Sequence, residues 1–181
     1  MPNHVKNVLK FSKLKPKDKE FILNKFASEM EDDFYPLNIA FDLDKIIPEP
    51  RKESECPEDC KVNKDSHIEE SGDRPWFDWY KWRCKYWGTK WNAYDCYTKI
   101  GVSTITFVFN TAWSTPMPIY EQLAKHFFFE FEVRYADENL GCNCGKVIYN
   151  PEKTKFADIV HITEYDMDNA KAFAWRLWNN Y

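Results

Sequence analysis

Hydrophobic and polar residues alternate over residues 4–11, and this alternation predicts a β-strand with one buried face. Runs rich in β-branched and aromatic residues predict further strands, of which the one at 103–110 has the composition of a central strand. The other predicted strands span residues 37–43, 96–100, 128–135 and 146–149.

Other segments repeat their apolar residues at the spacing of a helix. Phe21, Ile22 and Phe26 form one face of a helix that is predicted to begin at Pro16 and to end near Met30. Prolines also favour the first turn of a helix, because the N–H group that they lack is not needed there. Three more helices are predicted at residues 75–87, at 116–126 and from 166 onward.

The order of these elements indicates an α+β protein. A strand–helix–strand unit comes first, and the second half of the chain reads β-β-α-β-β-α. This order favours an antiparallel sheet with helices on one face. The 181 residues suit a single domain, 1–181. Residues 44–74 form a long polar loop within it, and loops of that length are usually functional or held by something extra.

Composition narrows the class of protein. Aromatic residues make up 18% of the chain, far above the content of a disordered chain. The formal net charge of −4 argues against a protein that is basic throughout, although it allows a local basic patch. No run approaches the roughly 20 apolar residues that span a bilayer, and the first residues lack the apolar core of a secretory signal. We therefore expect a cytoplasmic protein whose six cysteines are thiols or metal ligands.

Cysteines in and after the polar loop predict a metal site. Three residues separate Cys56 from Cys60, which is a usual spacing for paired ligands of a structural zinc ion. We expect one Zn²⁺ ion to staple the loop to the helix at 75–87, with Cys56, Cys60, His67 and Cys84 as ligands. The alternative is that Cys84 packs as a small hydrophobic side chain and the loop thiols bind nothing. Catalytic zinc is disfavoured, because no nearby His–Glu pair could act as a base.

Three other groups leave alternatives open. Cys142 and Cys144, flanked by glycines, fit a structural, a metal-binding or a redox role. The acidic residues between 29 and 59 fit either a solvated surface or a surface that mimics DNA. The aromatic residues of the helix at 75–87 fit either a buried core or a platform for stacking bases, with phosphate contacts from Lys81, Arg83, Lys85 and Lys90.

Three strings of residues resemble a known family. They read Trp-Gly-Thr-Lys-Trp-Asn-Ala-Tyr-Asp at 87–95, Phe-Asn-Thr-Ala-Trp at 109–113 and Tyr-Ala-Asp-Glu-Asn at 135–139. With the opening Met-Pro-Asn-His-Val-Lys-Asn, they make nearly the whole chain similar to the Api92-like or YubB-like family. The resemblance implies a ferredoxin-like domain, meaning the α/β sandwich and not an iron–sulfur cluster. It also implies an accessory protein of phages, plasmids or integrated elements, with no general enzymatic mechanism.

The resemblance implies a binding protein more than an enzyme, and the sequence lacks the familiar catalytic motifs. Similar small proteins of mobile elements include inhibitors of host defence nucleases, Cas9 among them. We therefore expect a phage-encoded anti-CRISPR protein that binds a host nuclease such as Cas9 and blocks DNA loading. The acidic loop and the aromatic helix would form the contact, and zinc would order it. The alternatives are a nucleic-acid-binding module that uses the sheet or the Trp-rich helix, and an enzyme built around Cys84 or the Cys142/Cys144 loop.

Overall fold

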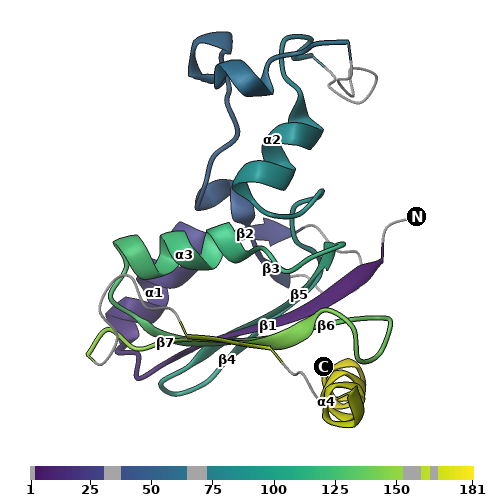
Figure 1. Cartoon of the computed structure of the whole chain (residues 1–181). Helices are drawn as coiled ribbons and strands as arrows, with labels where there is room; N and C mark the ends of the chain where they lie inside the picture. Colours follow the sequence, from purple (N-terminus) through teal and green to yellow (C-terminus); the bar gives the residue numbers. More distant parts are fainter. Residues whose placement is uncertain (1–2, 31–37, 65–72, 153–159, 164–166) are drawn as a thin grey trace.

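A six-stranded antiparallel sheet forms the body of the protein in the computed structural model, which describes residues 3–30, 38–64, 73–152, 160–163 and 167–181 (Figure 1). The strand order is β4-β5-β1-β6-β7-β8, and each neighbouring pair is antiparallel. The sequence predicts each of these strands except the last. They span β1 His4–Ser12, β4 Tyr94–Ile100, β5 Ile105–Ala112, β6 Glu130–Asp137, β7 Cys144–Tyr149 and β8 Val160–Thr163.

Helices α1 (Pro16–Phe26) and α3 (Met117–His126) cover one face of this sheet (Figure 1). The Asp18 side chain accepts a hydrogen bond from the Lys15 backbone N–H at 2.8 Å, which caps the start of α1. The elements β1-α1-β4-β5-α3-β6, with β1 between β5 and β6, follow the β-α-β-β-α-β arrangement of ferredoxin-like folds. The predicted α+β fold is therefore confirmed. The core between sheet and helices is rich in aromatic side chains, including Phe11, Phe26, Phe107 and Phe131.

Helix α4 (Met167–Asn180) lies on the opposite face of the sheet, so the prediction of helices on one face is wrong for this element (Figure 1). Alternate strand residues point to opposite faces, and Val8 and Val108 point away from the main core. A stripe of small and apolar residues on α4 covers them. This second core contains Val8, Val108, Ala136, Cys144, Ala170, Ala174 and Leu177. None of the helices in the described part of the chain is both long and apolar enough to cross a membrane.

The first helix ends earlier than the sequence predicts. α1 stops at Phe26, and Ala27–Met30 form strand β2, which pairs with β3 (Asn38–Phe41). Ala27 is buried opposite Phe41 in this small ladder. Tertiary pairing thus overrides the helical pattern of the sequence over these four residues.

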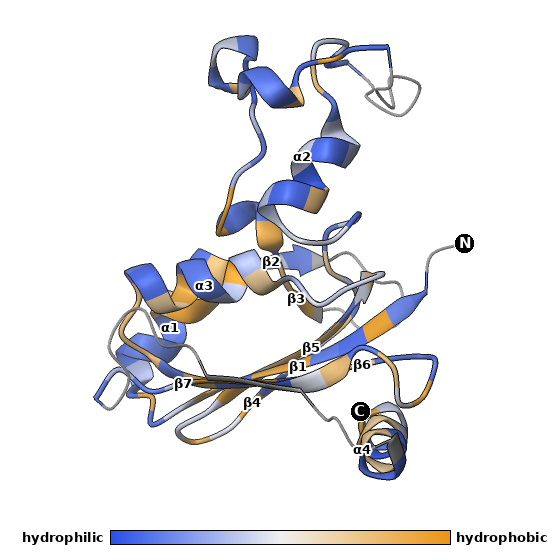
Figure 2. Ribbon diagram, in the orientation of Figure 1, coloured by the Kyte–Doolittle hydropathy of each residue, from blue (hydrophilic) through white to orange (hydrophobic). Residues whose placement is uncertain are grey.

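Between β3 and β4 the chain extends away from the body of the protein as an arm, defined here as residues 43–64 and 73–93 (Figure 1). The arm contains helix α2 (Trp79–Tyr86) and three 3₁₀ turns: η1 (Leu43–Lys45), η2 (Glu53–Glu55) and η3 (Glu58–Cys60). α2 begins later than predicted, because Asp78 caps it by accepting a hydrogen bond from the Lys81 N–H at 3.0 Å. Short turns therefore order the described part of the predicted loop. Its outer end is coloured mostly hydrophilic in Figure 2, whereas hydrophobic colour gathers on the strands.

Candidate functional site

The structure brings together two of the four predicted zinc ligands. Cys56 and Cys60 are both buried in the arm, and the Cys56 Sγ atom lies 3.4 Å from the Cys60 backbone oxygen. Cys84 is exposed, and His67 lies outside the described residues. Within the described ranges, no group of three His, Cys, Asp or Glu side chains is placed to hold a metal ion. Zinc binding therefore stays a prediction.

The geometry of α2 separates Cys84 from this pair. The Cys84 thiol lies beside the Tyr80 hydroxyl, one turn earlier in the helix. The next residue, Lys85, instead pairs with Asp59 of η3 at 2.6 Å. Because successive helix residues are rotated by about 100°, the side of α2 that carries Cys84 differs from the side that contacts η3.

Burial governs the chemistry of the two paired thiols. It raises the pKa of Cys56, and burial with the neighbouring Asp59 carboxylate raises the pKa of Cys60 to about 11. Both thiols are therefore protonated at neutral pH, and a metal ion would displace their protons on binding. Both side chains also belong to the main hydrophobic core, where a protonated thiol packs as a small apolar group.

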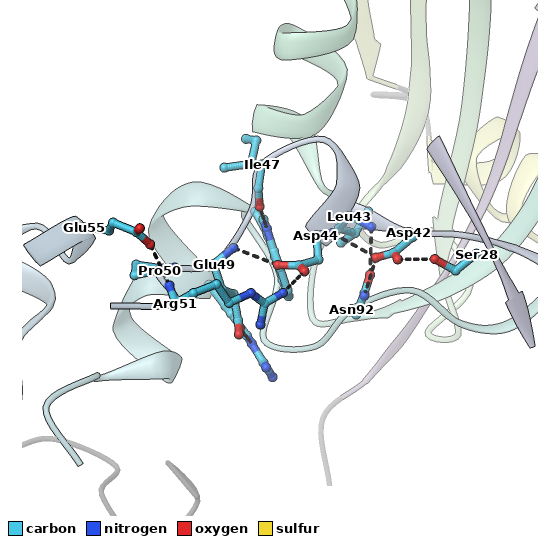
Figure 3. A network of polar contacts seen from close by, with 12 residues as sticks. Ser28, Asp42, Leu43, Asp44, Ile47, Glu49, Pro50, Arg51, Glu55 and Asn92 are labelled. Atoms are coloured by element: carbon cyan, nitrogen blue, oxygen red, sulfur yellow. Dashed lines mark hydrogen bonds and ion pairs between the residues drawn. The ribbon is translucent and has the colours of Figure 1, made fainter. Parts of the chain in front are cut away.

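A buried carboxylate joins separate segments of the arm. Glu49 accepts hydrogen bonds from Arg83 Nε at 2.5 Å and from Arg74 Nη2 at 2.8 Å, and its side chain is only 4% exposed. Burial alone would raise the pKa of Glu49, but the two guanidinium groups outweigh it and hold that pKa below its usual value. Figure 3 shows the adjoining contacts, in which Asp44 accepts a hydrogen bond from the Glu49 N–H at 2.7 Å. Glu49 thus ties the chain before η2 to α2.

Many of the acidic residues that fit a DNA-mimicking surface have partners within the protein. Asp42 accepts hydrogen bonds from Ser28 at 2.5 Å and from Asn92 at 2.8 Å (Figure 3), and Glu49 is buried between arginines. The acidic residues of η2 and η3 are exposed, but this surface is mixed in charge. Two ion pairs lie on it, Lys61 with Glu58 and Lys85 with Asp59. The arrangement favours the interpretation of a solvated surface.

Most tryptophans in and next to α2 are core residues. Trp79, Trp82 and Trp87 are 4%, 3% and 1% exposed. Arg83, which fits a phosphate contact in the sequence, lies over the Trp79 and Trp87 rings and pairs with Glu49. These side chains leave little ring surface on which an incoming base could stack.

Several residues of the string at 87–95 hold the fold together. Trp87 donates from Nε1 to the Ile47 oxygen at 2.8 Å. The Thr89 hydroxyl donates to the Ala112 oxygen at 2.8 Å and accepts from the Ala112 N–H at 3.0 Å. The Trp87 contact lies within the arm, whereas the Thr89 contacts join the arm to the end of β5. Both residues therefore have a structural role.

Gly88 and Asn92 of the same string also serve the fold. Gly88 has a φ of +77°, and a Cβ atom there would lie 2.8 Å from Pro118 Cδ. Asn92 accepts a hydrogen bond from the Leu43 N–H at 2.9 Å (Figure 3). Lys90, Trp91 and Tyr94 of the string are half-buried at the surface.

An aromatic surface surrounds Lys90 where the arm meets the sheet. We call Tyr80, Lys90, Trp91 and Trp113 the Trp113 patch. The Lys90 Nζ atom lies 5.2 Å from the ring centre of Trp91, 5.7 Å from that of Trp113 and 5.9 Å from that of Tyr80. Tyr80 and Trp113 meet edge to face, with ring centres 5.9 Å apart. Trp113 is 44% exposed, so the patch presents a large aromatic side chain to solvent.

Trp113 also has a strained backbone. Its φ is +70°, a conformation that is a genuine outlier for a bulky residue and costs about 1–3 kcal/mol. Two hydrogen bonds hold it: the Trp113 N–H donates to the Asn3 oxygen at 2.9 Å, and the Trp113 oxygen accepts from Asn143 Nδ2 at 3.0 Å. Strain of this kind is typical of functional sites. The sequence pattern does not single out Trp113 as a candidate site residue, although a Trp directly after a buried strand is a usable signal.

The two cysteines between glycines take different positions. Cys142 is exposed in the turn before β7, whereas Cys144 is buried beneath α4, with its Sγ atom 3.9 Å from the Ala170 oxygen. A structural role therefore accounts for Cys144.

Comparison with known proteins supports part of the resemblance. Residues 87–174 match the family model described as "Ferredoxin-like domain in Api92-like protein". The match covers just under half of the chain, from the end of α2 into α4. It includes Lys90, Trp91 and Trp113 of the patch. No curated protein and no solved structure matched the chain.

Proposed function

We propose that this is a phage or mobile-element protein that binds a host defence nuclease, such as Cas9, and blocks the loading of DNA. The observation that carries the proposal is the Trp113 patch. Tryptophan and tyrosine are enriched among the residues that dominate binding energy in protein interfaces. A Trp whose backbone is fixed on both sides also loses little conformational entropy when a partner covers it. Binding, without catalysis by this chain, is the activity that such a surface suits.

The resemblance supports the choice of partner. Residues 87–174 match the model of a ferredoxin-like domain in Api92-like proteins. The resemblance of the chain to that family implies an accessory protein of mobile elements. The contact surface differs from the one that the sequence favours. We assign it to the Trp113 patch and the neighbouring face of the arm, because the acidic residues of the arm are largely paired.

The predicted zinc ion remains part of this proposal, with fewer assigned ligands than the sequence predicts. Cys56 and Cys60 would be two of its ligands, and His67, a third predicted ligand, lies outside the described residues. The ion would order the outer end of the arm by coupling coordination to folding, and it would take no part in chemistry.

An order-of-addition cleavage assay tests the proposed function. Purified protein is mixed with a Cas9–guide complex either before or after target DNA, and cleavage is followed with time. We expect inhibition when the protein is added first and little inhibition once DNA is loaded. Unchanged cleavage in both orders, at protein concentrations of about 10 μM, would contradict Cas9 as the target.

One observation favours the alternative of a nucleic-acid-binding module. On the sheet face that carries α4, the exposed residues Lys10 and Lys99 stand on either side of Thr106, which pairs with both. Lys99 Nζ also lies 5.3 Å from the ring centre of Tyr97 and 5.1 Å from that of Tyr181. A single strand bound there would lose affinity steeply with added salt. Tight binding of a labelled oligonucleotide with such a salt slope would count against the inhibitor proposal.

A further inference from the structure

Lys90 is a cation held mainly by aromatic rings. Its Nζ atom lies within 5.2–5.9 Å of the ring centres of Trp91, Trp79, Trp113 and Tyr80. Rings attract an ammonium group through their quadrupoles, but they offer no lone pair to its three N–H donors. Among the residues that the structure describes, Lys90 has no hydrogen-bond or ion-pair partner. The ammonium is therefore fixed in place with its donors available.

The charges around the patch restrict what can bind there. Trp91 packs edge to face on Tyr94, with ring centres 5.9 Å apart. Asp95 and Glu138 lie near Tyr94, and with burial as the largest cause they raise the pKa of Tyr94 to about 12. A nucleic-acid strand with a phosphate at every nucleotide would meet these two carboxylates as well as the single ammonium. One isolated carboxylate brings a single negative charge, so it meets less of this repulsion than a strand does.

We propose that Lys90 recognises a carboxylate on an acidic peptide segment of the protein partner. The Asp or Glu side chain of that segment accepts hydrogen bonds from the Lys90 ammonium, and an apolar neighbour packs on the exposed ring of Trp113. This inference rests on the proposed function, because it names the group of the partner that the Trp113 patch contacts.

A peptide titration tests this site without any nuclease. The probes are the capped tripeptide acetyl-Phe-Asp-Phe-amide and its Asn counterpart, and the readout is the indole N–H resonance of Trp113. We expect a saturable shift with the Asp peptide and about tenfold weaker binding of the Asn peptide, the difference expected for a hydrogen bond to a charged group. Equal affinities of the two peptides would overturn the proposal. So would tighter binding of hexathymidylate than of the Asp peptide.

Two variants locate the effect at Lys90. Lys90→Met keeps an unbranched apolar stem against the rings and removes the charge, so it should bind both peptides with the affinity of the Asn peptide. Lys90→Arg keeps the charge and should still prefer the Asp peptide. A preference for Asp that survives in Lys90→Met would overturn the assignment. If Lys90→Met fails to fold, the Asp and Asn peptides on the native protein still decide the question.

The peptide and nuclease experiments can contradict the two proposals separately. Peptide binding without any effect on Cas9 would remove the proposed nuclease and leave the carboxylate site intact. Inhibition of Cas9 that is unchanged in a folded Lys90→Met variant would leave the inhibitor proposal intact and remove the role of Lys90.

Discussion

Glu49 joins two cationic side chains that reach it from different parts of the arm. Its carboxylate pairs with Arg74, which precedes α2, and with Arg83 within α2. The Glu49 side chain is only 4% exposed, so water screens these pairs weakly. Glu49 lies in the segment that the sequence predicts as a polar loop, but its buried side chain links two parts of the arm.

Replacing Glu49 by Gln should destabilise the protein by about 1–3 kcal/mol, because it leaves two half-buried guanidinium groups without a charged acceptor. Glu53→Gln is the matched control, since Glu53 is exposed, has no hydrogen-bond or ion-pair partner for its side chain among the described residues, and should change stability by less than about 0.5 kcal/mol. Urea denaturation of the two variants and the native protein measures both values. Equal stabilities of Glu49→Gln and the native protein would contradict the role of Glu49.

The contribution of Glu49 should also depend on pH. Its pKa is lower in the folded protein than in the unfolded chain, so the carboxylate stabilises the fold above the unfolded pKa of about 4.3. This stabilisation is lost as the pH falls through the folded pKa. The stability difference between the native protein and Glu49→Gln should thus stay constant from pH 7 to about pH 5.5 and shrink below about pH 4. A difference that grows on acidification would show that another group is responsible.

At the scale of elements, the arm could be predicted only in part. The sequence correctly predicts a helix within residues 75–87, but the contact of this helix with η3 depends on which side Lys85 takes. The rotation of α2 about its own axis is set by packing, which the sequence does not reveal. Sequence spacing alone therefore groups Cys84 with Cys56 and Cys60. The structure instead places Cys84 on another side of α2.

Metal analysis decides between these two arrangements. We expect purified, untagged protein to contain zinc, and Cys60→Ser to lose it and to melt at a lower temperature. Cys84→Ser should keep its zinc, because Cys84 stands apart from the buried pair. Loss of zinc from both Cys60→Ser and Cys84→Ser would indicate that Cys84 is also a zinc ligand. A native protein without zinc would contradict the proposed metal site altogether.

The strands of the main sheet were easier to predict than the contacts between elements. Alternation in β1 and β6 fixes which residues face each side of the sheet, but it does not reveal which helix covers each side. Nothing in the sequence around Val8 indicates that α4 packs on this residue. The strained backbone of Trp113 was likewise beyond sequence reasoning, because it depends on Asn3 and Asn143, which are distant in the chain.

At the scale of the whole molecule, a ferredoxin-like body carries an arm (Figure 1). The Trp113 patch lies where the two meet, since Tyr80 of the arm contacts Trp113 at the end of β5. Tyr80 and Lys90 come from the arm, and Trp113 follows the last residue of β5. The sheet supplies a rigid base, since β1 is paired on both sides. This arrangement suits a protein that presents a preformed surface to a larger partner.

The most direct test compares the affinities of two tryptophan variants for a Cas9–guide complex. Trp113 and Trp175 are 44% and 56% exposed, and Trp175 lies on α4, on the opposite face of the sheet from α1 and α3. We predict that Trp113→Ala weakens binding by at least about tenfold, whereas Trp175→Ala leaves it within about twofold of the native value. Equal affinities of the native protein and a folded Trp113→Ala variant would contradict the claim that the Trp113 patch is the binding surface.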